Sequence, residues 1–183
     1  MTMLEPYKFT HLGLGVYLIE TEAFEDHRGY FMEGYNREVF AKNGIKANFE
    51  QYNVSLSKHG ALRGLHYQKE SYAQAKLFRC VRGRIFDACV DLRKGSNTFG
   101  RVITATYSAE DKNMLFVPKG FANGIMGIAE EDSVVIYLVE GQHVPSAETG
   151  IRWDDPDLAI RWPLQPTLIS EKDKNWPLLK EIR

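Results

Sequence analysis

Short apolar segments separated by glycine recur along almost the whole chain, and this feature constrains its fold most strongly. Short strands at this spacing, broken by turn residues, are typical of all-β sandwiches and barrels. Aromatic residues reach 12% and suit such strands, because aromatic side chains pack well on a pleated surface. The expected strands are Val16–Ile19, Gly29–Tyr35, Gln51–Ser57, Ala61–Gln68, Ala75–Arg82, Arg84–Leu92, Arg101–Tyr107, Asn113–Val117, Ala122–Ile128 and Ser133–Val139.

Helices are expected in two short segments only. Arg37–Asn43 ends before Gly44, and in the tail Ser170 fits an N-cap that is followed by acidic residues. The 183 residues contain no long linker, internal repeat or low-complexity stretch, and this length suits one sizeable core. We therefore expect a single all-β domain over residues 1–183, with short peripheral helices.

Charge and cysteine usage narrow the class of partner and the compartment. The 23 basic and 24 acidic side chains leave a net charge of -1, whereas binding to nucleic acid or to a membrane surface needs a basic excess. Met1–Thr10 lacks the apolar core of a signal peptide, and no run approaches the roughly 18 apolar residues of a membrane span. Cys80 and Cys89 lie inside apolar runs without CxxC spacing, which favours buried, reduced thiols. We expect a cytoplasmic protein with neither nucleic-acid nor membrane partners.

The segment Arg84–Leu92 alternates strictly between two faces. Phe86, Ala88, Val90 and Leu92 share one face, while Ile85, Asp87, Cys89 and Asp91 share the other. Two interpretations fit this pattern. Either the strand is half-buried with a wet outer face, or its second face lines a polar cavity between two sheets.

Polar and titratable side chains that could take part in binding or catalysis are densest between residues 51 and 76. Strict alternation would put Arg63 and His66 on opposite faces, but a bulge at Gly64 would re-aim one of them. Two cations, Arg63 and Lys76, beside a titratable imidazole suit an anionic substrate or a developing oxyanion. The cluster consists of Gln51, Asn53, Arg63, His66, Gln68 and Lys76.

Motifs for metals, phosphates and serine hydrolysis are missing from the sequence. The five histidines show no HxH, HxxxH or HExxH spacing, so we expect no metal site. Neither GxxxxGK[ST] nor GxGxxG is present, and no GxSxG elbow occurs.

Seven motifs follow one another along the chain. They extend from residue 16 to about residue 176, which is nearly the whole chain, and together they are far more specific than any one of them. The motifs are Asp26–Glu33, Gln51–Gln68, Lys76–Gly83, Phe86–Gly95, Phe116–Ala122, Gly150–Asp157 and Ile169–Asp173. In this order they resemble the dTDP-4-dehydrorhamnose 3,5-epimerase family.

This resemblance implies a cupin-like jelly roll (a double-stranded β-helix) that forms a homodimer by strand exchange. It implies a small-molecule nucleotide-sugar substrate, dTDP-4-dehydro-6-deoxy-D-glucose, and no cofactor, because epimerisation transfers no net electrons. A ketone at C4 acidifies the C–H bonds at C3 and C5, so a base can form an enolate that is reprotonated on the other face.

The resemblance also implies roles for particular residues. His66 matches the family's base, Asp173 its carboxylate partner, Lys76 the cation near the C4 oxygen and Tyr137 the acid on the opposite face. Substrate contacts are implied for Gln51, Asn53, Arg63 and Asn123, and for Arg28 and Glu33 on the exchanged strand. From the residues alone, Asp173 also fits a helix first turn, Tyr137 a core aromatic and Lys76 a surface lysine.

The chain departs from the family pattern at a few positions. Asn123 stands where histidine is usual, and an amide cannot titrate. Leu138 and Gln142-His143 stand where the family usually has Lys and then a Tyr-rich stretch. Tyr52 stands where Asp is common. Two alternatives therefore stay open: an epimerase or ketoisomerase acting at C3 or C5 only, and a non-catalytic sugar-binding jelly roll. A metal-dependent cupin enzyme is the third class, which we do not expect.

Overall fold

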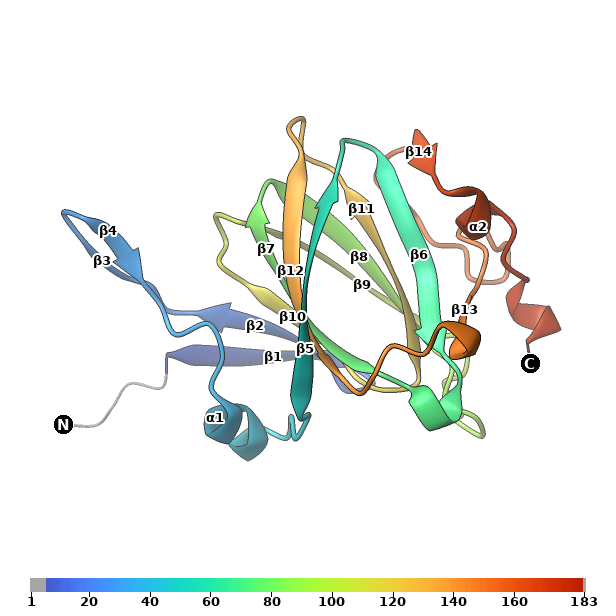
Figure 1. The fold of residues 1–183 in the computed structure, drawn as a ribbon, viewed down its shortest axis with the longest axis horizontal. Coiled ribbons are helices and arrows are strands. Elements are labelled where there is room, and N and C mark those ends of the chain that lie inside the picture. Colours follow the sequence, from blue (N-terminus) through green and yellow to red (C-terminus); the bar gives the residue numbers. More distant parts are fainter. Residues whose placement is uncertain (1–5, 183) are drawn as a thin grey trace.

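Two antiparallel sheets stacked face to face form the body of the protein in a computed structural model, which describes residues 6–182 (Figure 1). Residues 1–5 and 183 of the predicted domain lie outside that range. The strands are β1 (Tyr7–Gly13), β2 (Val16–Thr21), β3 (Phe24–Asp26), β4 (Gly29–Phe31), β5 (Phe49–Ser57), β6 (Ala61–Gln68), β7 (Ala75–Arg82), β8 (Arg84–Asp91), β9 (Val102–Ser108), β10 (Met114–Val117), β11 (Phe121–Gly127), β12 (Ser133–Glu140), β13 (Glu148–Gly150) and β14 (Leu168–Ile169). The helices are α1 (Arg37–Lys42) and α2 (Glu171–Lys174), with 3-10 turns at η1 (Glu70–Tyr72), η2 (Pro145–Ala147) and η3 (Leu179–Glu181).

The chain passes repeatedly from one sheet to the other between β5 and β13. The first sheet has the order β1-β2-β10-β7-β12-β5, and the second has the order β13-β6-β11-β8-β9, with β14 parallel to β6. A jelly roll winds between two sheets in this way, so the predicted all-β jelly-roll class is confirmed. A separate two-stranded hairpin, β3–β4, projects away from the sandwich (Figure 1).

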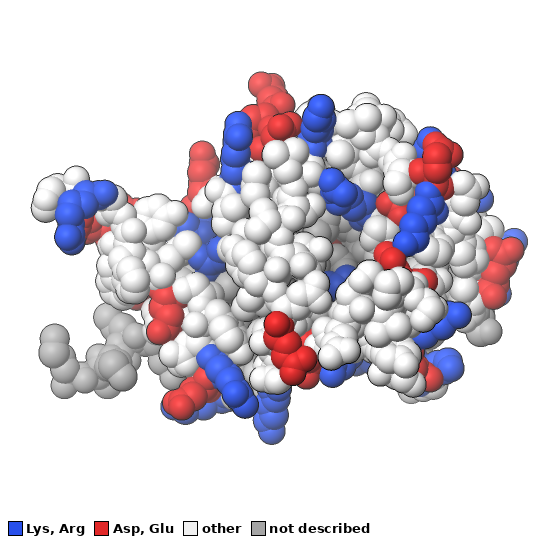
Figure 2. Space-filling view, in the orientation of Figure 1, with Lys and Arg blue, Asp and Glu red and all other residues white. Residues whose placement is uncertain are grey.

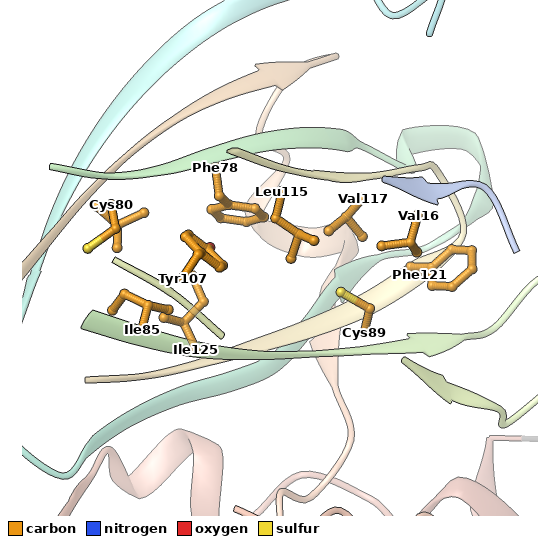
Figure 3. Close-up of a cluster of buried hydrophobic side chains, with 11 residues drawn as sticks. Val16, Phe78, Cys80, Ile85, Cys89, Tyr107, Leu115, Val117, Phe121 and Ile125 are labelled. Carbon is orange, nitrogen blue, oxygen red and sulfur yellow. The ribbon is translucent and has the colours of Figure 1, made fainter. Parts of the chain in front are cut away.

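The main core lies between the two sheets and is built by alternation along each strand. Figure 3 shows Phe78 and Leu115 from the first sheet meeting Ile85, Cys89 and other side chains from the second. The face of β8 that contains Asp87 and Cys89 therefore points between the two sheets, as the second interpretation held, but it packs in the apolar core and does not line either cavity described below.

The opposite face of the second sheet is also covered, so the first interpretation of β8, a half-buried strand with a wet outer face, is wrong. Phe86, Ala88 and Val90 pack under the segment after β13, including Ile151 and Leu158. On the first sheet, α1 inserts the fully buried Phe40 against a cluster of apolar side chains from β1, β2, β7 and β10. Apolar layers outside both sheets thus hold the sandwich in place.

The predicted strands all occur, most with ends within two residues, but four short or edge strands were missed. The prediction for Gly29–Tyr35 was wrong beyond Phe31, where the chain leaves β4. β1 mixes exposed and half-buried positions and pairs only with β2, and β3, β13 and β14 are two or three residues long. A strand of two or three residues is too short to carry a periodic pattern. Both predicted helices are present, and Ser170 caps α2 by accepting from the Asp173 N–H.

None of the helices formed by the described residues has the length and apolarity that crossing a bilayer requires.

Candidate active site

An imidazole and a carboxylate meet at the end of the sandwich. His66 Nε2 on β6 lies 2.5 Å from Asp173 Oδ1 on α2. The Ser170 cap fixes the first turn of α2 and turns the Asp173 side chain inward, where its residue is only 3% exposed. Because Asp173 engages Nε2, the neutral ring carries its proton there and Nδ1 keeps the lone pair.

Hydrogen bonds hold Asp173 ionised. Gly64 N–H donates to Oδ2 at 3.3 Å, and the Trp176 indole N–H donates to Oδ1 at 3.1 Å. Burial raises the pKa of Asp173, but the hydrogen bond and charge of His66, followed by the Gly64 and Trp176 donors, outweigh burial and leave that pKa below its ordinary value. The pair is therefore set up as a base backed by an anion.

A bulge in β6 brings Arg63 and His66 to the same cavity, as the sequence predicted. The pairing of β6 with β11 shifts register between Asn123 and Ile125, opposite Gly64. Gly64 has φ +117°, and a Cβ there would lie 2.6 Å from the Asn123 carbonyl oxygen. Only glycine tolerates that conformation and that close approach, so Gly64 is what makes the two side chains convergent.

A cavity of about 950 Å³ lies between β5 and β12 on one side and α2 on the other. Figure 2 shows a hollow in this surface with basic and acidic side chains around it. A smaller cavity of about 270 Å³ adjoins the larger one. Both are lined by His66, Lys76, Tyr137 and Glu148, so these four side chains stand at the junction between the two spaces. The total space is ample for a nucleotide-linked sugar.

Lys76 reaches the junction from β7 on the first sheet. Its Nζ donates to Asn123 Oδ1 at 2.9 Å. Burial lowers the pKa of Lys76, and the charge of Asp87 is the largest effect that opposes that shift. Burial raises the pKa of Asp87 to about 7, against hydrogen bonds from Cys89 and Tyr107 and the charge of Lys76. The Lys76 ammonium thus lies beside a neutral amide and can stabilise negative charge that develops in the cavity.

Tyr137 faces His66 from the opposite sheet. It lies on β12, next to Phe78, with ring centroids 5.1 Å apart. Burial raises the pKa of Tyr137, and the Arg63 charge and the Asn53 amide act in the opposite direction. A neutral phenol therefore stands across the cavity from an imidazole, which is the geometry for removing a proton on one face and returning it on the other.

The remaining predicted residues fall into two groups. Arg63 lines the larger cavity, held by Nε to Ser57 Oγ at 3.1 Å and by Nη2 to the Leu56 carbonyl at 2.8 Å. Gln51 and Asn53 line the smaller cavity and are joined by a 2.9 Å hydrogen bond.

Arg28 and Glu33 line neither cavity of this chain. Arg28 is exposed in the β3–β4 turn and pairs with Asp26 at 2.6 Å, and Glu33 accepts from Tyr7 Oη at 3.0 Å. The substrate contacts expected of them therefore require a second chain.

Two residues that line or support the site, Glu148 and Trp176, were missed by the sequence analysis. Glu148 lines both cavities and binds Lys172 Nζ at 2.8 Å, and Trp176 contacts Asp173. Glu148 lies on a three-residue strand and Trp176 follows α2, so no periodicity marks either of them. Their positions depend on contacts between distant segments.

Within residues 6–182, no three His, Cys, Asp or Glu side chains form a group that could hold a metal ion. The absence of a metal and of a cofactor stays a prediction.

The fold and the site together define a jelly-roll enzyme suited to acid–base chemistry, with a His–Asp pair, a lysine and a phenol around one cavity. The profile of the family described as dTDP-4-dehydrorhamnose 3,5-epimerase matches residues 13–181. The chain is 45% identical over 170 residues to the dTDP-4-dehydrorhamnose 3,5-epimerase of Methanothermobacter thermautotrophicus, covering 91% of each chain.

Solved structures agree with this match. The epimerase of Elizabethkingia anophelis superposes with a TM-score of 0.90 at 39% identity, covering 97% of this chain and 98% of that one. The dTDP-6-deoxy-D-glucose-3,5-epimerase of Legionella pneumophila, solved with dTDP-4-keto-L-rhamnose, has a TM-score of 0.91 at 35% identity, with coverages of 97% and 95%. This chain belongs to the dTDP-4-dehydrorhamnose 3,5-epimerase family, and it is an isomerase.

Proposed function

We propose that this protein inverts C3 and C5 of dTDP-4-dehydro-6-deoxy-D-glucose to give dTDP-4-dehydro-L-rhamnose, a step of rhamnose biosynthesis. The observation that carries this proposal is the His66–Asp173 pair, which faces Lys76 and Tyr137 in one cavity. Family membership supports the substrate class. The matched region, 13–181, supports a single catalytic domain.

Proton removal begins at the free Nδ1 of His66. The C4 ketone makes the neighbouring C–H acidic, and the electron pair left behind moves onto the C4 oxygen as an enolate. The imidazolium that forms is stabilised by the ionised Asp173, as in other His–carboxylate pairs. Asp173 needs no proton of its own, because its hydrogen bonds favour the charged form.

Lys76 stabilises the enolate. Its ammonium contacts only a neutral amide, Asn123, at hydrogen-bonding distance among the described residues, so its charge is not quenched by a bonded carboxylate. An oxyanion at C4 would gain this interaction in the transition state more than the ground-state ketone does, and such differential binding accelerates the reaction.

Tyr137 returns the proton on the other face of the sugar. It lies on the first sheet whereas His66 lies on the second, so a sugar held between them presents opposite faces to the two groups. Arg63, Gln51 and Asn53 then contact the substrate, with Arg63 suited to a diphosphate by its planar charged fork.

A second candidate, epimerisation at one carbon only, is favoured by Asn123. Asn123 stands where the family usually has histidine, and its amide cannot carry a proton. Its Oδ1 accepts a hydrogen bond from Lys76. The dTDP-4-dehydrorhamnose 3-epimerase of Streptomyces niveus is 36% identical over 92% of this chain.

Solvent deuterium separates these candidates. We expect incubation with dTDP-4-dehydro-6-deoxy-D-glucose in D2O to place label at both C3 and C5, which NMR would resolve, with inversion at both centres. Label and inversion at one carbon would establish the single-centre reaction. Binding without any exchange would contradict epimerisation and support a sugar-binding role.

A homodimer with strand exchange is part of the proposal. The outward face of β5 exposes Tyr52, Val54 and Leu56, with Val54 64% exposed, and the projecting β3–β4 hairpin exposes Phe31 at 72% (Figure 1). Exposed apolar side chains in a row along one strand are uncommon on a monomer, and a twofold dimer would cover them. Arg28 and Glu33 would then serve the neighbouring cavity.

Sedimentation velocity tests the dimer. We expect the protein to sediment as twice the chain mass and Val54→Lys to sediment as a monomer, because a buried lysine would oppose association. Tyr72→Lys is the matched control, since Tyr72 is 49% exposed on η1 and should leave the dimer intact. A wild-type protein that is monomeric at micromolar concentration would contradict the dimer.

We also propose that the protein acts in the cytoplasm. Both of its cysteines, Cys80 and Cys89, are free and buried, which is usual in a reducing compartment. Cell fractionation with an antibody would test this, and recovery in a membrane or secreted fraction would contradict it.

A further inference from the structure

The indole of Trp176 contacts the same carboxylate oxygen as the imidazole. Its Nε1 lies 3.1 Å from Asp173 Oδ1, which also receives His66 Nε2 at 2.5 Å. We propose that Trp176 is a positioning residue: its N–H holds Asp173 against His66 and spreads the carboxylate charge, which sets how strongly Asp173 stabilises a protonated imidazole. The catalytic meaning of this step rests on the proposed function, whereas the effect on the pair does not.

The surroundings of Trp176 fix its orientation from several sides. Its ring stands edge-on to the His66 ring, with centroids 6.3 Å apart and an interplanar angle of 77°. Lys172 Nζ lies over the indole face, 5.2 Å from the centroid, and is itself paired with Glu148 at 2.8 Å. A cation over the ring both anchors it and draws electron density from the N–H, which strengthens the donor.

Gly150 makes room for this contact. A Cβ at that position would lie 2.6 Å from Trp176 Nε1 and 2.6 Å from the Leu65 carbonyl oxygen. Gly150 pairs directly with His66 in the β13–β6 ladder. Glycine in the strand beside the proposed base therefore leaves the space that the indole nitrogen occupies.

The shared oxygen determines what the indole does to the imidazole. A carboxylate that accepts several hydrogen bonds is a weaker base, because each donor stabilises its ionised form. Asp173 already accepts from Gly64 N–H on its other oxygen. Removing the Trp176 donor would leave more negative charge to stabilise the imidazolium, so His66 would hold its proton to a higher pH.

Other charged groups around His66 remain in place when Trp176 is changed. Glu148 on β13 also interacts with the charge of His66. The other titratable and charged side chains that line its cavities are Lys58, Arg63, Tyr67, Lys76, Tyr137, His143, Lys172, Asp173 and Lys174. Substitution of Trp176 alone leaves these unchanged in sequence, so a shift would report on the indole N–H.

The test is an NMR titration of the His66 ring protons in substrate-free full-length protein, assigned with His66→Gln. We expect Trp176→Phe to move the titration midpoint upward by about half a unit or more, since it removes one charge-assisted hydrogen bond. The acid limb of the epimerase pH–rate profile should move in the same direction. Trp162→Phe is the matched control: its indole donates to the Trp153 carbonyl at 3.0 Å, in the apolar layer outside the second sheet.

The outcomes are distinct. An unmoved or lowered midpoint in folded Trp176→Phe, or an equal shift in Trp162→Phe, would overturn the proposal. Trp176→Leu, which also lacks the donor, gives the same reading if the phenylalanine variant does not fold. If the wild-type protein exchanges no deuterium, the proposed function fails, while the substrate-free titration still decides the role of Trp176.

Discussion

Replacement of His66 with alanine is expected to lower kcat for epimerisation about a thousandfold, while the affinity for substrate changes little. The imidazole is the group whose lone pair points away from Asp173, and no second histidine lines the larger cavity among the described residues. Loss of the ring also leaves the Asp173 carboxylate buried with one partner fewer. The measurement is kcat by NMR, with circular dichroism to verify folding.

A histidine elsewhere on the surface gives the control for this result. His59 is exposed, and its Nδ1 contacts the Ala129 carbonyl at 2.7 Å, away from both cavities. His59→Ala should keep full activity. Deuterium incorporation by His66→Ala at the wild-type rate would remove His66 from the mechanism, whatever its effect on stability.

The sequence predicted the part of the site that lies within one strand or between neighbouring motifs. The Arg63–His66 unit needed only the rule that glycine permits a bulge, and the register shift at Gly64 confirms it. Alternation likewise put Asp87 and Cys89 on one face of β8, and the structure turns that face toward the interior of the sandwich. Both inferences are local, because they depend on backbone geometry over a few residues.

Contacts between distant segments were beyond such reasoning. Asp173 reaches His66 across 107 residues of sequence, and only the family resemblance suggested the pair. Glu148 and Trp176 lie on segments too short for periodicity, and their positions follow from pairing with β6 and from the packing of the tail. The covered outer face of β8 was missed for the same reason, since a strand pattern does not say what packs on it.

Replacement of Lys76 with methionine is expected to lower kcat for epimerisation about a hundredfold, because the enolate would lose its cation in a site sheltered from water. Methionine keeps most of the apolar stem, so the packing between β7 and its neighbours should persist. The charge of Lys76 lowers the pKa of the buried Asp87, which stands at about 7. In Lys76→Met that pKa should therefore rise further, and Asp87 should stay protonated through neutral pH.

Comparison with a surface lysine isolates the contribution of charge in the cavity. Lys8 is exposed on β1 and pairs with Glu20 at 2.7 Å, so Lys8→Met should retain wild-type kcat. Single-turnover deuterium exchange distinguishes the chemical step from binding, because loss of enolate stabilisation must slow exchange at carbon itself. If Lys76→Met raised KM but exchanged deuterium at the wild-type rate once saturated, Lys76 would be a binding residue and the C4 oxygen would need another source of positive charge.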